Sequence, residues 1–154
     1  MENEGAGMSF EEKSAWIMGV LAIGSGSVYL AILLPLTATR PVVEVPYIAP
    51  MLWCIGASIM LSILLHTIIS TVARTTSGKK AARQKDERDR EIYRLGEQVG
   101  QSFLVIGGLS ALLMAMLRLD QFWIANAIFL AFVLSAILGS ITKIVAYRRG
   151  FQTW

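Results

Sequence analysis

Four long windows without a charged residue constrain the fold of this chain more than any other feature. They run over Ala15–Leu36, Met51–Val72, Val99–Leu117 and Phe122–Ile141. Each window holds about 20 residues, and an α-helix of that length is about 30 Å long, the thickness of the hydrocarbon core of a bilayer. Because lipid offers no partner to backbone N–H and C=O groups, each window is expected to be a helix. The sequence therefore predicts an all-α, polytopic membrane protein with four transmembrane helices.

The composition supports a single membrane domain. The chain has 154 residues, of which 55% are hydrophobic and only 16% charged. In a water-soluble fold the four windows would leave a large apolar surface uncovered. We expect one four-helix domain over 1–154, with spans at about 15–36, 51–72, 99–117 and 122–141 and a charged segment at 73–98. The net charge of +3 is too small to indicate direct binding of nucleic acid.

The first window could also be a signal peptide, since Lys13 precedes it. Its apolar run is longer than the apolar region of a signal peptide and lacks an obvious cleavage site of small residues. This favours a retained first helix. The only cysteine, Cys54, cannot form an intrachain disulfide and gives no information about the redox compartment.

The distribution of basic residues predicts the orientation in the membrane. Twelve of the 14 Lys and Arg residues lie before the first window, between the second and third, or after the fourth. The two remaining loops hold one each, Arg40 and Arg118. Basic residues are retained on the cytoplasmic side of a membrane. We therefore expect both termini and the charged segment to be cytoplasmic, in a multi-pass protein of the cell membrane.

The second half of the charged segment has the pattern of a helix. Ile92, Leu95, Val99 and Phe103 recur at spacings of three, four and four residues, which places them on one helical face. Asp86 and Arg90 are four residues apart and form a favourable pair in a helix. We expect the third transmembrane helix to begin in this segment and to extend into the cytoplasm.

This extension has two interpretations. It is either a solvated helix end that anchors the bundle, or a docking surface for a cytoplasmic partner, because both charge signs alternate around Tyr93. The candidate partner-binding residues are Asp86, Arg88, Asp89, Arg90, Tyr93 and Arg94. A metal site at the acidic residues is not expected, because helical spacing separates them and arginines stand between them. No cofactor is expected either.

A few polar residues fall within or beside the predicted spans: His66, Gln98, Gln101 and Ser102. Ionisable groups within a membrane are functional candidates. The structural alternative, which we favour, is an interhelical hydrogen bond from His66 to Gln101 or Ser102. A ligand or proton site remains an alternative, and haem would require a second ligand from elsewhere.

Small residues recur every four positions in the last two windows. They are Gly107, Ala111 and Ala115 in the third, and Ala127, Ala131, Ser135 and Gly139 in the fourth. Such ridges let helix backbones approach closely in lipid. We expect contacts within the chain, and contacts between subunits of a homodimer are the alternative.

The segments KDERDREIYRLGEQVGQSFLVIGG (85–108) and FWIANAIFLAFVLSAILGSITKIVAYRRGF (122–151) resemble an uncharacterised family of small bacterial four-helix membrane proteins. The resemblance extends more weakly to 11–20, 45–53 and the pair Leu65-His66. Members of that family are often encoded beside repressor-like helix-turn-helix regulators. The resemblance implies a membrane protein that holds or releases such a regulator, and it carries no catalytic residues.

Several functions are compatible with these features. The first is a regulatory or interaction protein that binds a cytoplasmic partner. The same features are equally compatible with an accessory subunit of a membrane complex. A small dimeric transporter is the second, although none of the four windows contains Asp or Glu, which ion-coupled transport favours. An enzyme is not expected, because nothing pairs a nucleophile with a base.

The predicted orientation can be checked by cysteine labelling in a Cys54→Ser background. A membrane-impermeant thiol reagent added outside intact cells should label Val43→Cys and Gln121→Cys but not Ala82→Cys. Strong external labelling at position 82 would contradict a cytoplasmic charged segment.

Overall fold

The computed structural model describes residues 10–76 and 87–149, and this part of the chain is helical throughout apart from its short connections. The elements are α1 (Phe10–Thr39), the 3-10 turn η1 (Val42–Glu44), α2 (Ile48–Thr76), α3 (Glu87–Met116) and α4 (Gln121–Arg149). All four α-helices are long and apolar enough to cross a membrane. Within residues 10–76 and 87–149, the predicted all-α class with four such helices is confirmed. The third begins at Glu87, ahead of the charge-free window that starts at Val99.

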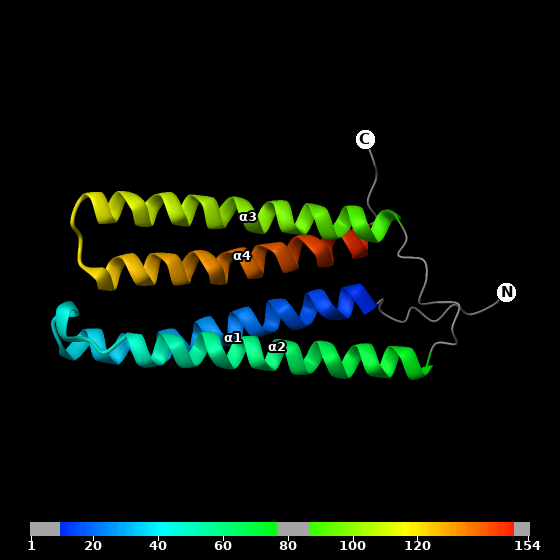
Figure 1. Ribbon diagram of the computed structural model, residues 1–154, viewed down its shortest axis with the longest axis horizontal. Helices are drawn as coiled ribbons and strands as arrows, with labels where there is room; N and C mark the ends of the chain where they lie inside the picture. Colours follow the sequence, from blue (N-terminus) through cyan, green and yellow to red (C-terminus); the bar gives the residue numbers. More distant parts are fainter. Residues whose placement is uncertain (1–9, 77–86, 150–154) are drawn as a thin grey trace.

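The helices form an open row in the order α3, α4, α1, α2 (Figure 1). Helix α3 packs along α4, α4 along α1, and α1 along α2. Within the described residues, α2 and α3 have no extended contact with each other. Short connections make sequential helices antiparallel. The first turns of α1 and α3 and the last turns of α2 and α4 therefore lie at one end, called the charged end, and η1 and the α3–α4 turn at the other, called the loop end.

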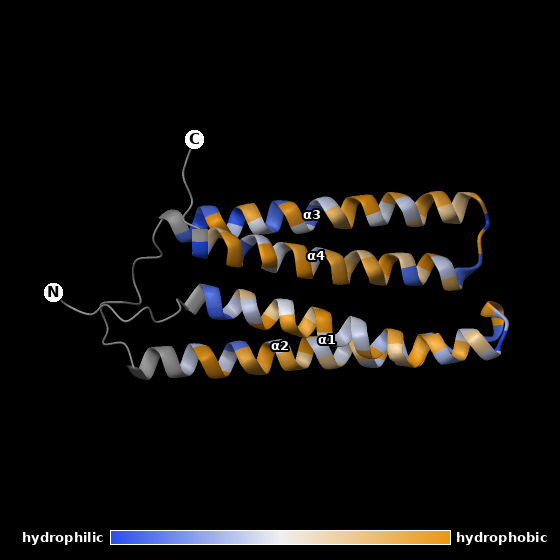
Figure 2. Ribbon diagram, turned by 180° about the vertical axis from the view of Figure 1, so that it is seen from behind, coloured by the Kyte–Doolittle hydropathy of each residue, from blue (hydrophilic) through white to orange (hydrophobic). Residues whose placement is uncertain are grey.

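The four α-helices are apolar along most of their length (Figure 2). Large side chains on every α-helix are exposed, among them Leu34 (63%), Met60 (60%) and Leu113 (60%). Hydrophilic residues gather at the two ends, including the first turns of α3. An apolar middle between polar ends suits the profile of a bilayer.

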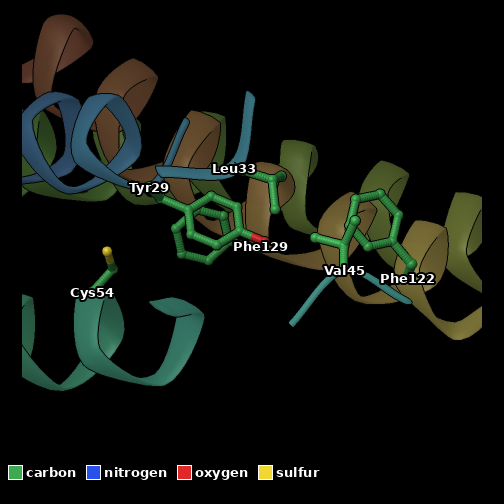
Figure 3. Close-up of a cluster of buried hydrophobic side chains, with 6 residues drawn as sticks. All are labelled: Tyr29, Leu33, Val45, Cys54, Phe122 and Phe129. Carbon is green, nitrogen blue, oxygen red and sulfur yellow. The ribbon is translucent and has the colours of Figure 1, made fainter. Parts of the chain in front are cut away.

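A buried cluster joins α1, α2 and α4 towards the loop end (Figure 3). The Tyr29 ring packs against Phe129 with ring centroids 4.5 Å apart and the planes tilted by 52°, and its hydroxyl donates a 2.6 Å hydrogen bond to Asn126 Oδ1. The Asn126 amide donates in turn to the Phe122 carbonyl at 2.8 Å. Each polar atom of this α1–α4 contact therefore has a partner, as a dry environment requires. The remaining members of the cluster are Leu33, Val45 and Cys54.

Helices α3 and α4 approach each other through small residues. A Cβ added to Gly107 would collide with the Cβ of Ala131, and one added to Gly139 would lie 3.0 Å from the carbonyl oxygen of Gly96. Farther along, a Cβ on Gly100 would lie 3.0 Å from Ser135 O. Of the predicted ridges, Ala111 and Ala131 are buried and Ala127 is half-buried beside Gly107, whereas Ala115 is exposed.

The close approach at Gly107 makes a stability prediction. Gly107→Ala should lower the unfolding free energy by about 1–3 kcal/mol, because the added methyl group must displace Ala131 and the α4 backbone behind it. Gly24→Ala is the matched control, since a Cβ there meets nothing within 4 Å. Thermal unfolding in detergent should show a lower midpoint for the first variant only. Equal midpoints would mean that the α3–α4 contact accommodates the added methyl group without loss of stability.

Candidate functional site

The candidate site is the charged end of the row. The first turns of α3 reach it packed into the row, because Ile92 is fully buried (0% exposed) and α3 packs along α4. Around Ile92, the side chains of Arg90, Tyr93 and Arg94 are exposed and Asp89 is half-buried. Of the other predicted partner-binding residues, Asp86 and the side chain of Arg88 lie outside the described part of the chain.

Lys143 of α4 contacts the first turns of α3 and thereby extends the α3–α4 contact, here called the seam, to the charged end. Its Nζ forms a 2.9 Å salt bridge with Glu97 Oε1 and lies 4.0 Å from the centre of the Tyr93 ring. The lysine side chain is only 9% exposed, whereas that of Glu97 is 55% exposed. The stem of Lys143 passes over Gly96, where an added Cβ would lie 2.5 Å from Lys143 Cγ. A buried ammonium group requires such partners, since burying an unpaired charge is costly.

A second ion pair lies between α4 and α1. Arg148 Nε approaches Glu12 Oε1 at 3.5 Å, and the guanidinium lies 5.5 Å from the centre of the Trp16 ring. This arginine is largely exposed (62%), so the pair contributes little to stability. Its effect is to place a second cation at the charged end, beside an aromatic ring of the kind found at membrane interfaces.

The predicted intramembrane polar residues are not brought together. His66 Nε2 lies 3.4 Å from Ser14 Oγ of α1, a long hydrogen bond, and not beside Gln101 or Ser102. The expected partners were wrong because α2 packs against α1 and not against α3. Ser102 instead donates to the carbonyl of Gln98 in its own helix, and both glutamine side chains are exposed.

The sequence analysis did not predict the Glu97–Lys143 pair, because Glu97 falls in the charged segment 73–98 and Lys143 lies beyond the fourth predicted span, 122–141. The candidate spans Asp89–Met116 and Gln121–Arg148 include both residues. A signal was present. Lys143 continues the four-residue ridge of Ala127, Ala131, Ser135 and Gly139, and Glu97 follows Gly96 on the facing helix.

The exposed groups at the charged end of α3 are of both signs: Arg90 and Arg94 are cations, Glu91 and Glu97 are anions, and the exposed Tyr93 lies among them. Among the described residues, no three His, Cys, Asp or Glu side chains are grouped so that they could hold a metal ion. Comparison with protein-family models, curated proteins and solved structures gives no match for this chain.

The asymmetric burial of the ion pair predicts unequal effects for its two halves. Glu97→Gln should lower the unfolding free energy by about 1–3 kcal/mol, because it leaves the buried Lys143 ammonium without its carboxylate. Lys143→Met should cost less, since it removes the buried charge and leaves Glu97, which solvent already reaches. Thermal unfolding at neutral pH would compare the two variants and the double variant.

The double variant Glu97→Gln/Lys143→Met should unfold close to Lys143→Met alone. If Lys143→Met costs more than Glu97→Gln, then the packing of the lysine stem over Gly96, and not the salt bridge, stabilises this seam.

Proposed function

We propose that this protein is a multi-pass protein of the cell membrane, with its charged end in the cytoplasm, that recruits a cytoplasmic protein to the first turns of α3. Within the described part of the chain, the docking surface consists of Asp89, Arg90, Tyr93 and Arg94. The partner that suits this role is a small helix-turn-helix regulator.

One observation supports the proposal above the others. The charged turns of α3 are not a free helix end, because Ile92 is fully buried, and Lys143 forms a salt bridge with Glu97 and contacts one face of the exposed Tyr93 ring. Arg90 and Arg94 are thus exposed on a pre-positioned helix. Groups that are already held in place lose less conformational entropy when a partner binds.

The choice of partner rests on the resemblance of 85–108 and 122–151 to a family of small membrane proteins. Members of that family are often encoded beside helix-turn-helix regulators. A regulator bound at the membrane is removed from DNA by mass action. A change in helix packing that favours one of two arrangements of the charged end could then release it. The proposed function is therefore sequestration, with no chemical step.

A small transporter is the second candidate. Glu97 supplies a carboxylate within the candidate span of α3, which the charge-free windows lacked. Its salt bridge with Lys143 neutralises it, however, and a coupling carboxylate must exchange its ion. Because this carboxylate is already paired, transport is a weaker candidate function than docking.

Charge reversal on α3 tests the docking role. Arg90→Glu/Arg94→Glu should abolish co-purification of a co-expressed helix-turn-helix regulator in mild detergent, because the exposed cations would become anions. Insertion and the thermal midpoint should stay unchanged, since exposed charges contribute little to stability. Arg40→Glu, which reverses an exposed arginine at the loop end, is the matched control and should retain the regulator.

If the reversed variant folds and still retains the regulator, the docking surface lies elsewhere. If both variants lose the regulator, the net charge of the protein and not the α3 surface determines binding. The proposed docking surface would then be wrong.

A further inference from the structure

The two inner helices of the row, α1 and α4 (Figure 1), leave a groove along their contact. Its half towards the charged end holds about 370 Å³. We call this half the inner groove, and its lining includes Trp16, Val20, Ile23, Ile141, Val145 and Arg148. A second hollow of about 520 Å³ continues between the same helices from Ile23 and Ile137 towards the loop end.

The wall of the inner groove is aliphatic and accessible. Val20 and Ile23 on α1 are 60% and 52% exposed, and Ile141 on α4 is 48% exposed. All three lie within the candidate spans Glu12–Thr39 and Gln121–Arg148. An apolar hollow holds water poorly, because water there lacks polar partners. Within a bilayer, hydrocarbon is therefore the occupant that suits this wall.

The width of the inner groove distinguishes an acyl chain from a helix. Between the levels of Ile137 and Arg148, α4 rises by about 16 Å. A volume of about 370 Å³ over that length gives a mean cross-section of roughly 20 Å². An α-helix with its side chains is about 10–12 Å across and covers a larger area. The groove is thus too narrow to admit a helix of a second copy or of another protein, whereas one extended chain fits.

A cation stands where the inner groove meets the charged end. The Arg148 guanidinium is held beside the groove by Glu12 Oε1, 3.5 Å from Nε, and by the Trp16 ring, whose centre is 5.5 Å away. Within the described residues, neither Nη atom of Arg148 forms a hydrogen bond. The two Nη groups therefore remain available, and an arginine fork of this kind matches the oxygens of a phosphate.

The exposed charge around this cation is positive. The Glu12 side chain is only 14% exposed, against 62% for Arg148, so the arginine is the member of the pair that a headgroup meets. Lys13 is also exposed and lies three residues before Trp16, on the same face of α1. A zwitterionic headgroup would bring its own cation close to these two. A headgroup with a net negative charge avoids that repulsion.

We propose that the inner groove binds one anionic phospholipid, with its phosphate on Arg148 and one acyl chain along the aliphatic wall. The proposal rests on the membrane placement given above but not on the docking role of α3, since it uses a different pair of helices. A lipid bound at this point would span the contact between α1 and α4 at the charged end.

Quenching of a single tryptophan tests the site on full-length protein in phosphatidylcholine vesicles. Trp53→Phe/Trp123→Phe/Trp154→Phe leaves Trp16 as the only tryptophan, and this is the parent protein. Phosphatidylglycerol with brominated acyl chains should quench Trp16 with about fivefold higher relative affinity than brominated phosphatidylcholine of the same chain length, the effect of one basic group at a membrane surface.

The role of the arginine is tested by Arg148→Gln, which should bring this preference close to one. Arg94→Gln is the matched control, because it removes the same charge from an exposed arginine at the same end, on a helix that does not line the groove. It should keep the parent's preference. An unchanged thermal midpoint for both variants would verify that the fold is intact.

The groove itself is tested by filling it. Val145→Phe places a ring in the inner groove and should lower both the quenching of Trp16 and the preference for phosphatidylglycerol, because the ring displaces the acyl chain. Val105→Phe is the matched control, since Val105 is exposed on α3 away from the groove, and it should change neither quantity.

The other outcomes would each overturn the proposal. A parent protein without preference for phosphatidylglycerol has no such site. A preference that survives Arg148→Gln, or that Arg94→Gln reduces equally, would assign it to the net charge of the protein. Equal effects of the two phenylalanine variants would show that the lipid does not occupy the groove. Co-purification of a regulator with α3 is measured separately, so either proposal can fail without the other.

Discussion

The close approach of α3 and α4 is the contact on which the rest of the structure depends. In a lipid environment there is no hydrophobic force between helices, so association relies on dispersion and hydrogen bonds, which require short distances. Gly96 and Gly139 allow the two backbones to meet, and Gly107 admits Ala131. A larger side chain at any of these positions would separate the helices over several turns.

The charged end follows from this seam. Because Gly96 has no side chain, Lys143 can lie across α3, reach Glu97 and contact one face of the Tyr93 ring. The ammonium is then buried but paired, and the first turns of α3 are tied to α4 beyond the charge-free window. The same small residues that permit packing within the span therefore also orient the charged turns outside it.

The open order of the helices has a separate consequence. A closed bundle would bury the outward faces of both α2 and α3, but here each stands at an edge. Both edges present apolar side chains, and hydroxyls on each edge bond to the backbone of their own helix, such as Thr67 on α2 and Ser110 on α3.

The sequence by itself determined the number and type of helices, because a charge-free window of that length permits only one kind of backbone pairing in lipid. It also indicated the ridges on α3 and α4 through their four-residue spacing. The tertiary structure alone decided which helices are neighbours. His66 contacts Ser14 and not Gln101, and Lys143 contacts Glu97. Both contacts follow from the order of the helices in the row. Periodicity specifies the face that a residue occupies on its own helix, but it does not specify which helix that face will meet.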